Sequence, residues 1–180
     1  SVKEIQTDVP RIDFTDDTTG HLLLEPQSTN TATYSNDFTQ GDVFNGSSDP
    51  SLNSSVLTSE QGVAPDGTNT AQKLTDNNDG GTGTIGLSYF SVNLTSGQQS
   101  TVSIFVKKDT LRYFVISFAN FDTNQEISFD LDTNTINRGS GVITEYGNGW
   151  YRCSATFSTT TDTVGAIGFY GTDLANVVGG

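Results

Sequence analysis

The 180-residue sequence is poor in cysteine, methionine and positive charge. It contains one cysteine, Cys153, and no methionine. A single cysteine excludes an intrachain disulfide and a metal cluster held by cysteines. Only 8 Lys and Arg stand against 21 Asp and Glu, so the formal net charge is -13. Such a charge argues against binding to nucleic-acid phosphates or anionic lipid, whereas neutral glycans would not be repelled.

Long apolar runs, helical periodicity and catalytic motifs are also lacking. No stretch approaches the about 20 apolar residues of a membrane-spanning helix, so membrane insertion is not expected. No amphipathic helix of three turns can be drawn, which argues against βαβ units. The one histidine, His21, has no nucleophile motif near it. The carboxylates Asp130 and Asp132 lie two residues apart on one predicted strand face, a spacing that does not indicate a glycosidase without a cleft. We therefore expect a protein that is not an enzyme.

What the sequence does contain is typical of an all-β protein. Thr, Ser, Asn and Gly are abundant, and 11 Phe and 6 Tyr supply large apolar side chains. Strand-length runs separated by turn residues recur at a spacing of roughly ten residues, which implies a β-sandwich or a β-barrel. The predicted strands are 83–94, 101–108, 112–120, 126–131, 142–146, 150–157 and 164–170. The length is typical of one domain.

The strand predicted at 150–157 has two different faces. It follows an Asn148-Gly149 turn and alternates with the period of a β-strand. One face is mostly apolar and suits a core, while the other combines an aromatic ring, Trp150, with a hydrogen-bonding cation, Arg152. This second face is a plausible sugar-binding surface. In the strand at 101–108, Phe105 is the odd residue, because alternation places it on the outward face.

Several segments together resemble a known family. They are Leu22-Leu23-Leu24-Glu25-Pro26-Gln27-Ser28-Thr29-Asn30, Tyr34-Ser35-Asn36-Asp37-Phe38, Ala64-Pro65-Asp66-Gly67 through Leu74, and Ser103-Ile104-Phe105-Val106-Lys107-Lys108 with Asn148-Gly149-Trp150-Tyr151-Arg152-Cys153. In order and approximate spacing over about residues 10 to 170, they resemble β-sandwich domains of bacteriophage tail-fibre and head-fibre proteins. That family is similar to jelly-roll carbohydrate-binding modules and to concanavalin-A-like lectins. The fold class we predict is therefore an antiparallel β-sandwich, jelly-roll-like.

The resemblance also sets expectations for the ends of the chain. Residues 1–30 are expected to form an extended N-terminal arm or linker, and residues 31–180 the β-sandwich binding domain. Such domains usually close with a further strand, but this sequence ends at Val177-Val178-Gly179-Gly180. We expect the final strand to be missing, or to be replaced by the arm or by a neighbouring chain. Ser28 is a second departure, because a basic residue is more familiar before Thr29-Asn30.

The function that these features predict is non-catalytic carbohydrate binding. The resemblance implies a lectin-like module of a phage fibre that recognises a host-surface or extracellular polysaccharide, located on a virion or outside the cell. One alternative is a structural domain that forms trimers in a fibre and binds no glycan. Another is an accessory binding module of a polysaccharide-degrading enzyme.

Sugar binding needs flat aromatic rings and hydrogen-bonding side chains at their edge. The residues of these types that we predict at the site are Trp150, Arg152, Tyr113, Tyr89 and Asp130. For two of them the sequence leaves alternatives open. Trp150 either stacks on a sugar or packs under a loop at the rim of the sheet. Arg152 either contacts the ligand or pairs with Asp130 or Asp132.

Structural calcium is the one cofactor that the resemblance implies, because it is common in jelly-roll binding modules. Hard oxygen ligands occur at close spacing in two places, Asp16-Asp17 and the loop from Asp76 to Asp79. Neither matches the spacing of an EF-hand loop, and turn chemistry explains both. The weak metal candidates are therefore Asp16, Asp17, Asp76 and Asp79.

Overall fold

The computed structural model describes residues 12–13, 21–22, 38, 55–58, 61–76, 84–119 and 125–173, and it describes side chains at 38, 58, 61–75, 92–119 and 126–173. The chain divides into two compact units, Ser1–Thr31 and Ala32–Gly180. In the first, strand β1 (Ile12–Asp13) pairs with the antiparallel strand β2 (His21–Leu22). The role of residues 1–30 as an arm or linker stays a prediction.

The second unit is built from β-strands. Their bounds are β3 Ser55–Thr58, β4 Lys73–Asp76, β5 Thr84–Leu94, β6 Gln99–Lys107, β7 Tyr113–Ala119, β8 Gln125–Asp130, β9 Thr135–Arg138, β10 Val142–Gly147, β11 Trp150–Ser158 and β12 Thr163–Thr172. All seven predicted strands are present. Strand β9 was not predicted, because its four residues contain a single apolar side chain, Ile136, too little to show a period of two.

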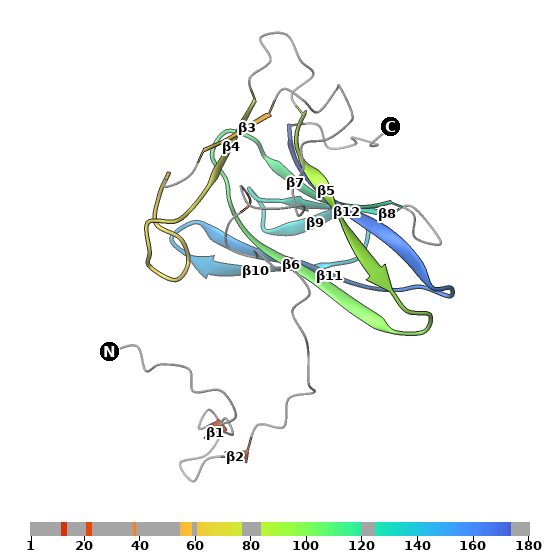
Figure 1. Ribbon diagram of the computed structural model, residues 1–180. Helices are drawn as coiled ribbons and strands as arrows, with labels where there is room; N and C mark the ends of the chain where they lie inside the picture. Colours follow the sequence, from red (N-terminus) through yellow and green to blue (C-terminus); the bar gives the residue numbers. More distant parts are fainter. Residues whose placement is uncertain are drawn as a thin grey trace. The chain divides into compact units, whose positions relative to one another are not determined.

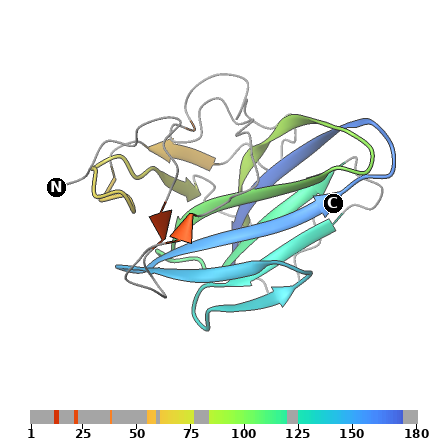
Figure 2. The same ribbon diagram turned by 90° about the horizontal axis from the view of Figure 1, so that it is seen from below.

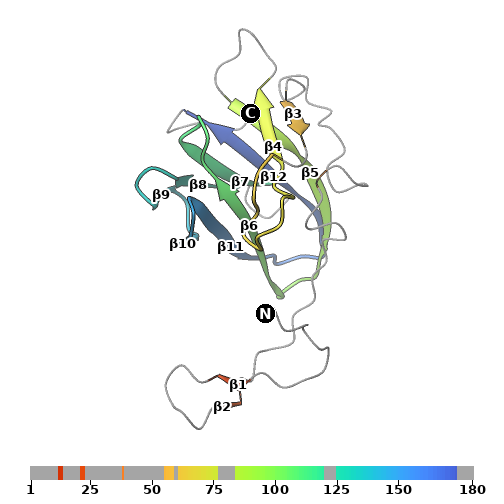
Figure 3. The ribbon, with the colours of Figure 1, turned by 90° about the vertical axis from the view of Figure 1, so that its left-hand side faces the viewer.

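Eight of these strands form two antiparallel sheets that pack as a sandwich (Figures 1, 2 and 3). The larger sheet has the order β5-β12-β7-β8-β9 and the smaller one the order β10-β11-β6. The early strands β5 and β6 pair with the late strands β12 and β11, so the chain wraps as in a jelly roll. The described residues include no helix. The predicted all-β antiparallel sandwich is thus confirmed.

The core lies between the two sheets and follows the alternation of the strands. Cys153 of β11 and Phe129 of β8 are both fully buried and belong to one hydrophobic cluster. Burying one side chain such as that of Phe129 contributes about 1.5–3 kcal/mol. The rings of Phe118 and Phe157 lie 4.9 Å apart, centroid to centroid, and join the larger sheet to the smaller one. Each sheet therefore commits one of its faces to the core.

Strand β7 is buried on both faces, as is usual for a central strand. It lies between β12 and β8. Ile116 and Phe118 belong to the core, and Tyr113 and Val115 on the opposite face are less than a tenth exposed. The same parity places Asp130 on the outer face of the larger sheet, because Asp130 pairs with Tyr113 across the strands.

The link from β9 to β10 carries the chain from the larger sheet to the smaller one. Its backbone passes close to residues of the core. At Gly139, where φ is +78°, an added Cβ would lie 2.6 Å from the carbonyl oxygen of Glu126. At Gly141 it would lie 2.8 Å from the carbonyl oxygen of Ser154 and 3.1 Å from the Phe129 ring. A side chain has no room at either position, so glycine allows the crossing.

We predict that Gly139→Ala destabilises the domain more than Gly67→Ala. Both positions have positive φ, which costs a non-glycine residue about 1–2 kcal/mol. Only Gly139 adds a steric clash, because nothing lies within 4 Å of a Cβ at Gly67. The free energy of unfolding, measured in urea, should fall by about 1 kcal/mol or more beyond the control. Equal losses of unfolding free energy in the two variants would show that the backbone around Gly139 shifts at no cost to make room for the added methyl group.

Candidate functional site

The outward face of the smaller sheet is the candidate site, and we call it the β10–β11–β6 face. Cross-strand pairing aligns Phe105 with Arg152, Lys107 with Trp150, and Thr144 with Arg152. The opposite parity supplies the core, which confirms the two faces predicted for the strand at 150–157. The positions on this face are Gln99, Thr101, Ser103, Phe105, Lys107, Val142, Thr144, Tyr146, Trp150, Arg152, Ser154, Thr156 and Ser158.

Two exposed aromatic rings meet on this face. Phe105 is 39% exposed and Tyr146 is 57% exposed. Their centroids are 4.8 Å apart and their planes are inclined by 67°, an edge-to-face arrangement that aromatic pairs favour. A bulge between Glu145 and Gly147 makes Tyr146 the extra residue of β10. Tyr146 was not predicted as a site residue, although its alternation with Val142 and Thr144 was a usable signal.

Arg152 lies exposed beside this aromatic pair. Its Nη2 donates a hydrogen bond to the Ser103 hydroxyl, 3.1 Å away on the neighbouring strand. The alternative that Arg152 pairs with Asp130 or Asp132 is wrong, because Asp130 ends β8, Asp132 lies in the turn after it, and both pair with Arg112. The contact with Ser103 holds the guanidinium against the sheet.

Trp150 is half-buried at the end of the face and contacts a loop. Its Nε1 donates to the carbonyl oxygen of Val63, 3.1 Å away. The loop has its own backbone hydrogen bonds, from Gln61 N to Ala71 O and from Ala71 N to Gly62 O. This geometry agrees with the alternative in which Trp150 packs under a loop at the rim of the sheet. Trp150 thereby anchors residues 61–71 at the edge of the sheet. A stacking role for its ring stays a prediction.

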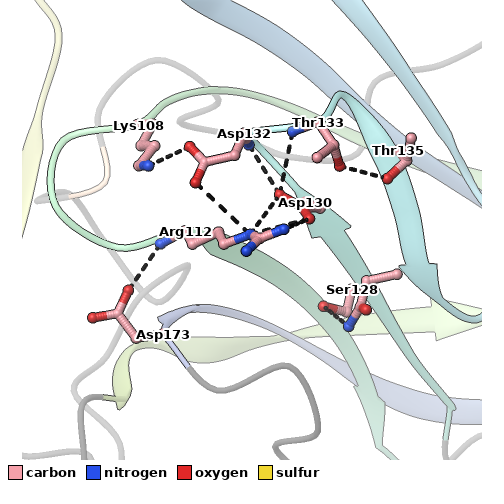
Figure 4. Close-up of polar contacts among 9 residues, drawn as sticks. Lys108, Arg112, Ser128, Asp130, Asp132, Thr133, Thr135 and Asp173 are labelled. Atoms are coloured by element: carbon pink, nitrogen blue, oxygen red, sulfur yellow. Dashed lines mark hydrogen bonds and ion pairs between the residues drawn. The ribbon is translucent and has the colours of Figure 1, made fainter.

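Asp130 occupies a different place, at the end of β8, where it is only 5% exposed (Figure 4). Its two oxygens accept bonds from Arg112 Nε at 3.0 and 3.1 Å and from Arg112 Nη2 at 2.6 Å. Oδ1 also accepts from the backbone amides of Asp132 and Thr133. The Arg112 hydrogen bonds, and then the amides, hold the pKa of Asp130 well below its usual range. With these partners Asp130 stabilises the fold and has little capacity left for a sugar hydroxyl.

Further contacts extend this cluster across the end of the larger sheet. The backbone amide of Arg112 donates to Asp173 Oδ1 at 3.1 Å, and Lys108 pairs with Asp132 (Figure 4). The Arg112 guanidinium lies 5.1 Å from the centroid of Tyr113, close enough for a cation–π contact. Tyr113 itself is 7% exposed. The cluster ties the β6–β7 link, the end of β8 and the end of β12 together.

The predicted sugar-binding residues therefore do not form one site. Trp150 and Arg152 lie on the β10–β11–β6 face, whereas Tyr113 and Asp130 lie on the outer face of the larger sheet. Tyr89 is a residue of β5, and its side chain lies outside the described residues.

No metal centre is seen in the described part of the chain. Within it, no group of three His, Cys, Asp or Glu side chains is arranged to hold a metal ion. Asp16, Asp17 and Asp79 lie outside the described residues, as does the side chain of Asp76 at the end of β4. Cys153 is fully buried, and burial raises the pKa of its thiol to about 12. The thiol is therefore a packing group.

No protein-family model matches the chain, and no curated protein matches its sequence. Within the described residues, no helix has the length and apolar character to cross a lipid bilayer.

We predict that Asp130→Asn lowers the stability of the domain in a pH-dependent way. The folded pKa of Asp130 lies below the unfolded value of about 3.9, so its contribution is fully present above that value. At pH 7 the loss in unfolding free energy should exceed the about 0.5 kcal/mol of an ordinary surface change. The difference from wild type should shrink as the pH falls below about 4. Urea unfolding from pH 7 to pH 3 measures it, and a constant difference would contradict the assignment.

We predict that Trp150→Phe loosens the loop at residues 61–71. The variant keeps an aromatic ring but loses the donor to Val63, which should cost about 1 kcal/mol. Amide hydrogen exchange should become faster at the loop amides that donate within it, namely Gln61, Ala64, Gly67 and Ala71. Tyr146→Phe is the control, because Tyr146 lies on the same sheet. Unchanged exchange would show that the loop does not depend on the indole.

Proposed function

We propose that the domain is a non-catalytic carbohydrate-binding module and that the β10–β11–β6 face is its binding surface. The observation that carries this proposal is the exposed pair Phe105 and Tyr146 beside Arg152. The C–H face of a pyranose ring stacks on such rings, and the guanidinium hydrogen-bonds hydroxyls at the ring edge.

The rest of the face suits the same ligand. Thr144, Ser154 and Ser103 surround Arg152 on the three strands and offer hydroxyl donors and acceptors. Because the pleated sheet fixes their spacing, little side-chain freedom is lost on binding. The open face of a sheet suits an extended polymer better than a small molecule, which needs a concave pocket. Trp150 and the Val63 loop border the surface at one end.

The setting that we propose is a bacteriophage fibre, where the module would recognise a polysaccharide on or around the host cell. The support for this is the set of sequence segments that resemble fibre domains, above all the segment Leu23-Leu24-Glu25-Pro26-Gln27. The placement on a virion or outside the cell follows from that resemblance alone.

The second candidate is a structural role in which this face packs against another copy. Val142, 59% exposed, adds to the apolar area of Phe105 and Tyr146. In a two-fold contact through the face, however, each copy would present the positive charges of Lys107 and Arg152 to the equally positive face of its partner. This repulsion favours carbohydrate binding. Light scattering at increasing concentration tests the rival, since a stable dimer or trimer would support it.

We predict that Phe105→Ala and Tyr146→Ala each weaken polysaccharide binding without unfolding the domain. Both rings are partly exposed, so their removal leaves the core intact. Loss of one stacking ring should raise the dissociation constant about fivefold to tenfold. Affinity electrophoresis against a panel of soluble polysaccharides measures the effect.

The matched control for these two variants is Val164→Ala. Val164 is also exposed, at 56%, but it belongs to β12 of the larger sheet. It should bind as the wild type does. Equal binding by all three variants would remove the face from the site, and no binding by the folded wild type to any member of a broad panel would favour the structural role.

A further inference from the structure

The Lys and Arg side chains of the described residues differ in whether they form an ion pair. Four of the six Lys and Arg side chains described form ion pairs with a carboxylate: Lys73 with Asp109, Lys108 with Asp132, Arg112 with Asp130 and Arg138 with Glu126. The other two are Lys107 and Arg152, which pair with no carboxylate among the described residues. Both cations therefore remain available to a ligand.

These two cations lie on the β10–β11–β6 face, next to the aromatic rings. Lys107 is aligned with Trp150 and Arg152 with Phe105, on the adjacent strands β6 and β11. The two cations are thus diagonal neighbours, a relation in which the residues are roughly 7–8 Å apart and their Cβ atoms somewhat closer. No position of the face is Asp or Glu, although acidic residues outnumber basic ones 21 to 8 in the sequence. The sign of the local charge is opposite to that of the whole chain.

Arg152 is prepared to bind an anion. Its guanidinium has five N–H donors, and Nη2 donates to Ser103. This bond orients the planar group while other donors stay exposed. A guanidinium binds a carboxylate through two parallel hydrogen bonds, and such charge-assisted bonds are roughly twice as strong as neutral ones. Lys107 adds a second, less directional charge to the same area.

We propose that this face selects a carboxylate-bearing polysaccharide, a polyuronate, whose acidic group binds Arg152 and Lys107 while its sugar ring stacks on Phe105. The inference rests on the proposed function and names the class of its ligand. In a uronic acid the carboxylate is bonded directly to the pyranose ring. Stacking on Phe105 therefore brings that carboxylate within reach of Arg152, its cross-strand neighbour at about 4.5–5.5 Å between Cβ atoms.

The net charge of -13 opposes the approach of any polyanion, but it does so at longer range. At about 0.15 M salt the screening length is about 8 Å, so carboxylates farther than this from the face act weakly on it. Contacts at hydrogen-bond distance are screened much less. Binding should therefore be measured at this ionic strength.

The experiment compares one polymer in two charge states. The full chain is titrated by calorimetry with polygalacturonate and with the same polymer after methyl esterification, which removes the charge and keeps the sugar. We expect polygalacturonate to bind at least about tenfold more tightly, as a charge-assisted bond predicts. Dextran sulfate and a panel of neutral polysaccharides complete the set.

Matched variants test the residues. Arg152→Gln should weaken polygalacturonate binding by about tenfold or more, and Lys107→Gln by a smaller factor. Arg138→Gln makes the same change in net charge on the larger sheet, where Arg138 pairs with Glu126. It should leave binding unchanged. Circular dichroism confirms that each variant is folded.

The outcomes separate this inference from the proposed function. Equal affinity for the two forms of the polymer, or equal losses in Arg152→Gln and Arg138→Gln, would overturn the selection of carboxylates and leave carbohydrate binding standing. Tighter binding of dextran sulfate than of polygalacturonate would overturn it in favour of unspecific attraction to polyanions. Failure of the folded protein to bind any polysaccharide would overturn the proposed function, and this inference with it.

Discussion

The sandwich depends on the interleaving of alternate side chains from two antiparallel sheets. Phe129 from the larger sheet and Cys153 from the smaller one are fully buried in the same cluster, together with Ile116 of β7. Protein interiors are close-packed, so each of these positions tolerates little change in volume. Because the inner faces supply this core, each strand has only its outward positions left for other uses. Gly139 and Gly141 of the β9–β10 link also have no room for a larger side chain, because this link passes close to core residues.

The two outward faces differ in how completely their polar groups are used. On the larger sheet Asp130, Arg112 and the neighbouring amides bond to one another, and Tyr113 is buried beside them. Such a network holds chain segments together. On the smaller sheet the aromatic pair of Phe105 and Tyr146 remains exposed. The bonded groups of the first face stabilise the fold, whereas the second face leaves two aromatic rings exposed to solvent.

Much of the fold could be predicted from the sequence. Apolar and polar residues alternate along a strand with a period of two, and this alternation shows which side chains face the core. The strand at 150–157 was predicted with the correct faces, and Phe105 was correctly placed outward. Strand β9 escaped notice because four residues with one apolar side chain show no period. The sequence also could not show the partners of Asp130, because Arg112 is 18 residues away and meets it only through the β7–β8 pairing.

The candidate site was harder to predict than the fold for the same reason. Aromatic residues and cations could be recognised as types, but alternation does not tell which of two sheets a strand will join. Trp150 and Arg152 share a strand and so remained together, whereas Tyr113 and Asp130 belong to the other sheet. Tyr146 shares the parity of Val142 and Thr144, so alternation alone was enough to indicate its outward position.

The state of Cys153 bears on the environments in which this fold can persist. It is the only cysteine of the sequence, it is fully buried, and burial keeps its thiol protonated. Oxidants and disulfide exchange act on accessible thiolates. Reducing conditions therefore cannot break an intrachain disulfide in this chain, because it has none. Under oxidising conditions the buried thiol of Cys153 is protected from reaction. A chain made in a reducing cell interior and used in an oxidising exterior would keep the same covalent structure throughout.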